Sequence, residues 1–367
     1  MYFWEDPNWP HFSWDDSKLL ESLGIARLKQ GRLLGRMGQL GFAVKGDAQV
    51  DALTEEVIKS SEIEGEVFQR DSVMSSVARH LGVPHAATTP SDRRTDGVVE
   101  TLLDATQRYD EPLTQERLLR WHASLFSTVG SGLHAVTVGQ WRDDAEGPMQ
   151  VVSGPVGKQR VHYQAPPAAR VDEEMARFLQ WFNTRPAPIE ALLRAGLAHL
   201  WFVTIHPFDD GNGRIARTIT DQALAQSEGS GQRFYSMSSQ IRKERAVYYE
   251  MLERTQKGTL DVTDWLSWFL QCLARAIDAA ESTSGAVLQR ADFWQRHSHE
   301  HFSERQRKVL NRYLVGFDGK LTSRKWAAIG KCSAPTAQRD INELVARGVL
   351  RRNTGGSKNT SYELGDS

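Results

Sequence analysis

The sequence predicts a mainly α-helical protein with one β-hairpin and a small mixed domain at the C-terminal end. Apolar residues recur at spacings of three and four through most of the chain up to about His299, which is the periodicity of amphipathic helices. Two short strand-like segments, MQVVS at 149–153 and QRVHYQ at 159–164, are joined by GPVGK, whose glycines and proline suit a hairpin turn. After Ser303 the helical segments become shorter and are followed by two further strand-like segments.

The helical segments define the expected organisation of the chain. They cover residues 18–40, 48–64, 71–81, 96–109, 114–126, 171–183, 189–205, 212–226, 243–257 and 261–280, with a further helical stretch to about His299. Glycine, proline and polar clusters separate them. We expect three parts: an N-terminal helical extension at 1–110, a helical core at 111–285 that carries the hairpin, and a C-terminal domain at 300–367.

The C-terminal pattern resembles a winged helix. SERQRKVLNRYL, LTSRKWAAIG and APTAQRDINELVARG read as three helices, and GVLRR, GGSKN and TSYEL read as a hairpin wing. The third helix, 334–347, would be the recognition helix, and the cations that could touch DNA phosphates are Arg339, Arg351, Arg352 and Lys358. Winged helices also serve as protein-contact or dimerisation modules, and Asp340 and Glu343 on the same helix oppose a nucleic-acid face. DNA contact is therefore one of two expectations.

Composition excludes several classes of protein. A formal net charge of -1 with 25% charged residues gives no global attraction to nucleic acid or to anionic membranes. The two cysteines, Cys272 and Cys332, lie far apart and support neither a disulfide framework nor a zinc site. The N-terminus lacks the pattern of a signal peptide, and no apolar segment approaches 18 residues. We expect a cytoplasmic protein with no membrane segment.

The stretch HPFDDGNGRIAR, at 206–217, carries the most chemistry in the sequence. Pro207 disfavours helix at His206, so the chain must turn there before helical periodicity resumes near Arg214. The backbone N–H groups at the start of the new helix favour an anion. Glycines allow a phosphate to approach the backbone, and Asn212, Arg214 and Arg217 add side-chain donors. The pattern predicts a site for a polyphosphate.

Two residues of the same stretch point to group transfer. A carboxylate within an anion site is repulsive unless a cation lies between, so Asp210 indicates Mg²⁺. His206 can accept a proton near neutral pH, which suits deprotonation of an attacking hydroxyl. The residues therefore predict nucleotidyl or phosphoryl transfer. A capped loop between core helices would explain Pro207 and the glycines, but not the convergence of the polar residues.

These residues resemble the signature of the Fic family, H-x-F-x-[D/E]-G-N-[G/K]-R-x-x-R. The matching positions are His206, Phe208, Asp210, Gly211, Asn212, Gly213, Arg214 and Arg217. Members of this family mostly transfer AMP from ATP to a hydroxyl of a target protein. The resemblance implies that His206 is the base, that Phe208 is buried and fixes the loop, and that Asp210 holds magnesium. It further implies that residues 211–213 cradle the phosphates, and that Arg217 binds the γ-phosphate.

A second stretch, SSEIEG at 60–65, resembles the inhibitory motif of the same family, [S/T]-x-x-x-E-[G/N]. The matching residues are Ser60, Glu64 and Gly65. The resemblance implies that Glu64 pairs with Arg217 and occupies the arginine that the γ-phosphate needs. In some family members the same glutamate orients water for removal of AMP. Without the resemblance, the stretch is an ordinary helix end with Gly65 as its cap.

The resemblance implies further contacts for substrates and partners. The hairpin at 149–164 lies where family members carry a flap that aligns the target by adding a strand to its edge. Tyr248 and Tyr249 resemble a wall beside the adenine, although one of the pair can belong to the core. Fic proteins of this architecture suggest a homodimer.

The leading hypothesis is therefore an autoinhibited protein adenylyltransferase that uses ATP and Mg²⁺ and can also modify itself. Enzymes of the same fold that remove AMP, or that transfer another nucleotide or phosphate, are the alternatives within enzymology. Glycine at position 213 weakens phosphate transfer, since relatives that transfer phosphate carry lysine there. A different class is a DNA-binding regulator that uses the same site as a nucleotide sensor.

Overall fold

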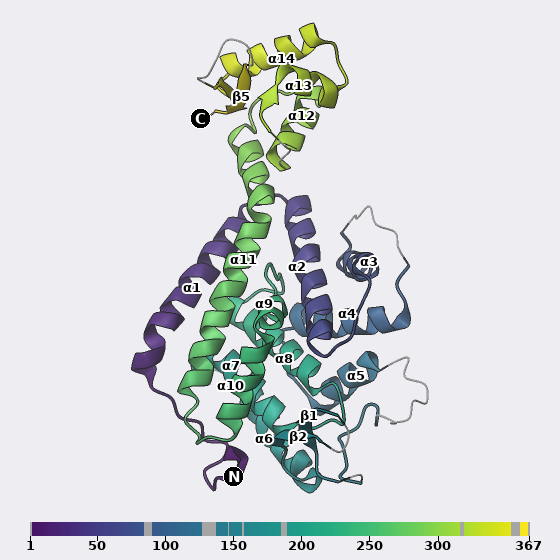
Figure 1. The fold of residues 1–367 in the computed structure, drawn as a ribbon, viewed down its shortest axis with the longest axis vertical. Helices are drawn as coiled ribbons and strands as arrows, with labels where there is room; N and C mark the ends of the chain where they lie inside the picture. The colour runs from purple at the N-terminus through teal and green to yellow at the C-terminus, as the bar shows by residue number, and fades with distance from the viewer. Residues whose placement is uncertain are drawn as a thin grey trace. The chain divides into compact units, whose positions relative to one another are not determined.

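The computed structural model describes residues 2–83, 90–126, 137–145, 147–155, 158–184, 189–315, 319–353 and 360–365 (Figure 1). The described chain is mainly helical with two small antiparallel sheets, as the sequence predicts. None of its helices, within these ranges, is long and apolar enough to cross a membrane. The chain divides into two compact units: Met1–Gly38 with Lys45–Glu281, and Gln39–Val44 with Ser282–Ser367.

The first unit holds most of the helices. In chain order its elements are α1 (Asp16–Gly38), most of α2 (Phe42–Ile63), α3 (Arg70–Leu81), α4 (Arg93–Gln107), α5 (Gln115–Leu125), β1 (Gln150–Ser153), β2 (Arg160–Gln164), α6 (Val171–Asn183), α7 (Ala191–Ile205), α8 (Asn212–Glu228), α9 (Met237–Lys243), α10 (Arg245–Gln256) and the first part of α11 (Thr263–Arg296). Short 3-10 helices lie at Phe3–Glu5 and Ala168–Arg170.

Helix α7 is the centre of this unit. Every residue from Leu192 to Ile205 is buried, because the helix is apolar around nearly its whole circumference. Helix α8 packs along it, and its residues Asn212 to Ala225 are almost all buried as well. The loop that joins these two helices is therefore held between two rigid elements.

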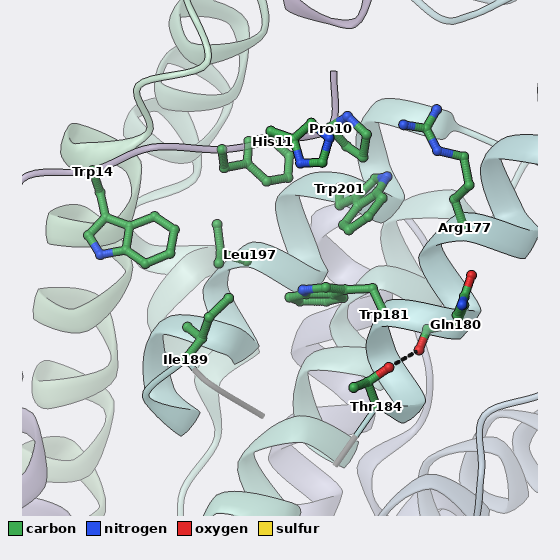
Figure 2. Close-up of a pocket in the computed structure, with 11 residues that line it drawn as sticks. Pro10, His11, Trp14, Arg177, Gln180, Trp181, Thr184, Ile189, Leu197 and Trp201 are labelled. Carbon is green, nitrogen blue, oxygen red and sulfur yellow. Dashed lines mark hydrogen bonds between the residues drawn. The ribbon is translucent and has the colours of Figure 1, made fainter. Parts of the chain in front are cut away.

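A cavity of about 450 Å³ lies between the N-terminal aromatic stretch and helices α6 and α7 (Figure 2). Trp181 and Trp201 line it from the two helices, with ring centroids 5.2 Å apart, and His11 faces them from the N-terminal stretch. None of its described lining residues belongs to 206–217. The cavity is thus separate from the anion site expected from the sequence.

The hairpin at 149–164 forms as expected. Strands β1 and β2 pair antiparallel, with Val151 opposite Tyr163 and an irregularity between Val151 and Val152. The Tyr163 hydroxyl donates to the Thr204 carbonyl oxygen at 2.5 Å, which ties β2 to the last turn of α7. The turn residues 156 and 157 lie outside the described part of the chain.

The second unit contains three further helices and a small sheet. The elements are α12 (Glu304–Val315), β3 (Leu321–Thr322), α13 (Ser323–Gly330), α14 (Ala334–Ala346), β4 (Leu350–Arg352) and β5 (Ser361–Leu364), with sheet order β3-β5-β4. Trp326, Ile341 and Tyr362 are among its fully buried core residues. Helices α12, α13 and α14 and the β4–β5 hairpin are those of the winged-helix interpretation, which stays a prediction. Strand β3 was not expected, because the segment from Leu321 was predicted to be wholly helical. Lys358 lies outside the described residues.

Two further elements differ from the sequence prediction. Helix α9 was not expected; the Ser236 side chain caps it by accepting from the Ser239 N–H, but seven residues are too few to show helical periodicity. The helix expected at 261–280 and the helical stretch after it form one continuous helix, α11, of 34 residues. Neither difference moves a residue of the candidate site.

Candidate functional site

The loop between α7 and α8 turns sharply at both ends. His206 closes α7 with a left-handed backbone (φ 52°), and its N–H donates to the Phe202 carbonyl oxygen at 3.0 Å. Gly211 precedes α8 with φ 82°, a conformation that favours glycine. The chain therefore turns at His206 and again before α8, as the sequence predicts.

His206 is anchored at one ring nitrogen. Its Nδ1 lies 3.0 Å from the Val203 carbonyl oxygen, so Nδ1 carries the proton and donates. Nε2 is then the lone-pair nitrogen of a neutral ring. Burial lowers the pKa of His206 below its ordinary value, and the positive charge of Arg142 acts in the same direction. The side chain is half-buried and has the protonation state of a general base near neutral pH.

Asn212 fixes the loop through its side chain. Its Nδ2 donates to the Phe208 carbonyl oxygen at 2.7 Å, and its Oδ1 accepts from the Phe208 N–H at 3.0 Å. Both ends of the amide are thus bonded within the loop and the residue is 2% exposed, and its role as a side-chain donor to a phosphate stays a prediction. Its backbone N–H at the start of α8 is a further donor for an anion.

Phe208 is fully buried, as expected, and it rests on a histidine that the sequence did not reveal. Its ring stacks on the His122 ring with centroids 4.1 Å apart. His122 Nδ1 accepts from the Gly139 N–H at 3.0 Å, and Nε2 donates to the Asp210 carbonyl oxygen at 3.2 Å. Burial lowers the pKa of His122 to about 4, so the ring is neutral and its tautomer is fixed.

Arg142 is a second residue that contacts the loop and that sequence reasoning missed. Its Nε donates to the His206 carbonyl oxygen at 2.8 Å, and its backbone N–H donates to the Pro207 carbonyl oxygen at 2.9 Å. The guanidinium is fully buried and pairs with Asp144 at 2.7 Å. Nothing in the sequence around 122 or 142 marks these residues, because their loop contacts span 88 and 64 positions.

Asp210 is the exposed carboxylate of the loop. Its side chain is 60% exposed, Oδ1 accepts from the Gly211 N–H at 2.6 Å, and Oδ2 lies 3.7 Å from Arg214 Nη2. Among the described residues no group of three or more His, Cys, Asp or Glu side chains could hold a metal ion. One carboxylate nevertheless fits Mg²⁺, which is usually bound by one or two carboxylates together with phosphates and water.

The Arg217 side chain is covered by Ser60 and Glu64, which belong to the segment that was expected to inhibit. Its Nε donates to Ser60 Oγ, and its Nη2 donates both to the Ser60 carbonyl oxygen and to Glu64 Oε1, at 2.8–2.9 Å. The Arg217 side chain is 3% exposed. Gly65 follows with φ 85°, so glycine has a backbone reason to end this helix.

The Glu64 carboxylate lies directly over Gly213. A Cβ atom added at position 213 would come within 2.2 Å of Glu64 Oε1. The missing side chain at 213 therefore leaves the space that Glu64 occupies at the start of α8. This is a physical reason for glycine at 213 that is independent of phosphate binding.

Arg214 is also closed off, by a residue that the sequence analysis did not single out. Its Nη1 donates to Glu66 Oε2 at 2.9 Å, and its guanidinium carbon lies 4.9 Å from the centre of the Phe126 ring. The Arg214 side chain is 4% exposed. Both arginines of the motif are therefore paired with carboxylates from the segment that follows α2.

The two tyrosines expected beside the adenine differ. Tyr248 is 2% exposed and its hydroxyl lies 2.8 Å from His199 Nε2, so it belongs to the core here, and its place in a nucleotide wall stays a prediction. Tyr249 is 36% exposed, and the Arg245 guanidinium lies 5.4 Å from its ring centre. Burial raises the pKa of Tyr249, and the Glu64 charge adds to this.

Comparisons with known proteins agree with this geometry. Residues 112–224 match the model of the Fic/DOC family, and residues 2–83 match a domain of unknown function, DUF4172. A protein adenylyltransferase Fic of Nematostella vectensis is 31% identical over 116 residues, which is 31% of this chain and 25% of that protein. Its counterpart in Drosophila melanogaster is 29% identical over 105 residues, 28% of this chain and 20% of that protein. The aligned region thus spans a quarter or less of these relatives.

Two solved structures share the fold. A Fic family protein from Desulfovibrio desulfuricans has a TM-score of 0.54 at 20% identity, over 94% of this chain and 96% of that one. A Fic domain containing signaling protein from Bacteroides thetaiotaomicron has a TM-score of 0.51 at 17% identity, over 70% of this chain and 97% of that one. The chain is thus similar to the Fic/DOC family over residues 112–224, and it shares its fold with both of these structures.

Proposed function

We propose that this chain transfers AMP from ATP to a hydroxyl group of a target protein, or of its own Ser, Thr or Tyr residues, and that Glu64 inhibits it. The observation that carries the proposal is the arrangement of residues 206–217. A neutral imidazole anchored through Nδ1 lies beside a helix start whose two arginines are buried against acidic residues. The relatives named protein adenylyltransferase support the same reaction.

In the proposed reaction His206 Nε2 accepts the proton of the attacking hydroxyl. The hydroxyl oxygen forms a bond to the α-phosphorus of ATP, the bond to the bridging oxygen breaks, and pyrophosphate leaves. The α8 N–H groups and Arg214 and Arg217 would hold the phosphates. Asn212, His122 and Arg142 hold the loop from behind, so that the imidazole keeps its position.

Magnesium would be held by Asp210 together with the phosphates. The exposed carboxylate at the start of α8 is suitably placed on the chain for this, because it precedes Gly211 and the N–H groups of the helix. Mg²⁺, when bound, neutralises charge that develops on the leaving phosphates. Replacing Asp210 by asparagine should therefore raise the magnesium concentration required for activity.

Inhibition follows from the pairing of Arg217. A phosphate cannot reach a guanidinium that is 3% exposed until Ser60 and Glu64 release it. Glu64 also brings a negative charge to the place where the γ-phosphate would bind. The proposed resting state is thus one that binds ATP weakly.

We infer that the hairpin aligns the target by adding a strand. Val152 and Val161 face each other across the two strands and are 40% and 38% exposed, which leaves an apolar pair at the surface. Main-chain pairing to such an edge positions a peptide with little side-chain specificity. Tyr163 connects this hairpin to Thr204 at the end of α7, and Thr204 lies two residues before His206.

The experiment that tests the proposal uses purified wild-type, Glu64→Gly and His206→Ala proteins with Mg²⁺ and ATP labelled at the α-phosphate. We expect strong protein labelling with Glu64→Gly, weak labelling with wild type and none with His206→Ala. If no variant incorporates label, alone or with cell lysate as the source of targets, transfer of AMP from ATP is wrong. Label that appears equally in His206→Ala would remove the base from the proposal.

A second candidate is DNA binding by the C-terminal unit, with the Fic site as a nucleotide sensor. Asp340, which counted against a nucleic-acid face, points inward: it is 6% exposed and bonds to Arg305 and Trp326. Arg339 and Arg352 are exposed on α14 and β4. Salt-dependent DNA binding that responds to ATP would support this candidate.

A further inference from the structure

Glu66 lies two residues beyond Glu64, and its carboxylate contacts two arginines. Glu66 Oε2 is 2.9 Å from Arg214 Nη1 and 3.1 Å from Arg94 Nη2, which comes from α4. The Arg94 guanidinium lies 4.7 Å from the centre of the Phe68 ring, so it is held from the other side. Glu66 therefore connects the segment after α2 with both α4 and α8.

The turn that ends α2 sends the two carboxylates to different arginines. The Glu66 N–H donates to the Ser61 carbonyl oxygen at 3.0 Å, and Gly65 between the two glutamates has a left-handed backbone. Glu64 thus reaches Arg217, while Glu66 reaches Arg214 one turn earlier on α8. One short segment places a negative charge on each arginine of the motif.

The two pairs have the same burial pattern. Arg214 and Arg217 are 4% and 3% exposed, whereas Glu66 and Glu64, which cover them, are 26% and 28% exposed. Arg214 Nε is buried and has no hydrogen-bond partner within the described structure. A phosphate approaching from solvent therefore meets a carboxylate before it meets either guanidinium.

We propose that Glu66 is a second inhibitory carboxylate, which closes Arg214 as Glu64 closes Arg217. The inference rests on the proposed function, because it assumes that Arg214 contributes to the binding of ATP phosphates. Loss of Glu64 alone then uncovers Arg217 but leaves Arg214 paired with Glu66. Full opening of the phosphate site requires the release of both glutamates.

The chain offers a matched control in Glu62. It lies in the last turn of α2 and its side chain is also 26% exposed, but it pairs with Lys59 and Arg242 and with neither motif arginine. Glu62→Gln removes the same charge as Glu66→Gln. Any effect of net charge on nucleotide binding will appear equally in both variants.

The first measurement follows the closure itself and needs no nucleotide. Phenylglyoxal, an arginine reagent, is applied to the folded variants and the modified residues are mapped by mass spectrometry. We expect Glu66→Gln to increase modification of Arg214 at least threefold without changing Arg217, and Glu64→Gly to do the reverse. Glu66→Gln with the Arg214 reactivity of Glu62→Gln would overturn the inference.

The second measurement is ATP binding with Mg²⁺ in a His206→Ala background, where transfer is absent. We expect Glu66→Gln to tighten binding about fivefold, and to add to the effect of Glu64→Gly in the double variant. If ATP binds to Glu64→Gly but Glu66→Gln brings no gain, or weakens binding because Glu66 holds Arg214 in place, only the inference is overturned. If ATP binds to no variant, the proposed function falls as well.

Discussion

Arg217 Nη2 donates to Glu64 Oε1 at 2.8 Å across 153 positions of sequence. The same guanidinium donates to the hydroxyl and the carbonyl oxygen of Ser60. Three bonds to one helix end hold the arginine in a fixed place. In the structure, Arg217, which would bind the γ-phosphate in the proposed reaction, is therefore covered by Ser60 and Glu64.

Gly213→Ala should weaken this closure. The new Cβ would fall 2.2 Å from Glu64 Oε1, and the flexible carboxylate can move away more easily than the backbone of α8. We expect ATP to bind about threefold more tightly than to wild type, measured by calorimetry with Mg²⁺. In a Glu64→Gly background the same substitution should bring no gain, since nothing remains to displace. Equal gains in both backgrounds would show that the effect does not act through Glu64.

Substitution of Tyr248 should change stability, whereas substitution of Tyr249 should change nucleotide binding. Tyr248→Phe removes the buried hydroxyl beside His199 Nε2, so we expect a loss of about 1–3 kcal/mol in the free energy of unfolding and an unchanged Kd for ATP. Tyr249→Ala should leave stability nearly unchanged and weaken ATP binding in the Glu64→Gly protein. Urea unfolding and calorimetry measure the two quantities, and a reversed pattern would return Tyr248 to the nucleotide site.

Asn212→Ala should cost stability as well as activity. The substitution leaves the N–H and the carbonyl oxygen of Phe208 buried without partners, which predicts a loss of about 2–4 kcal/mol on urea unfolding. Thr218→Ala is the control on the same helix: its hydroxyl only adds a bond to the Arg214 carbonyl oxygen. A loss for Asn212→Ala no larger than for this control would mean that the amide does not hold the loop.

The sequence predicted the site where its residues are contiguous. The backbone turns at Pro207 and at the glycines follow from local rules and are present in the structure. The burial of Phe208 was implied by the resemblance to the Fic family, and the residue is buried. The bonds of the Asn212 amide to its own loop were not predicted, because a side-chain donor can serve a ligand or its own loop and the spacing in the sequence is the same. The sequence also could not show which of Tyr248 and Tyr249 belongs to the core, because this depends on which of them faces α7 and α11.

Contacts distant in sequence could not be predicted. His122, Arg142 and Glu66 reach the loop or its arginines only after several helices have packed, and no local pattern distinguishes them from other helix and loop residues. The helical periodicity located most elements because amphipathic faces repeat over many residues. It missed α9, because seven residues complete fewer than two helical turns and do not show a repeating apolar face.

The pKa of His206 should depend on its burial and on the charges of Arg142 and Glu64. Burial and the Arg142 charge lower its pKa, whereas the Glu64 charge raises it, so removal of Glu64 should lower the pKa further. We expect NMR titration of the His206 ring to give a midpoint below 6.5 in wild type and a lower midpoint in Glu64→Gln. Because the base acts in its neutral form, the acid limb of kcat/KM in an activated variant should also lie below pH 6.5. A midpoint that rises when Glu64 is neutralised would contradict the effect of the Glu64 charge on His206.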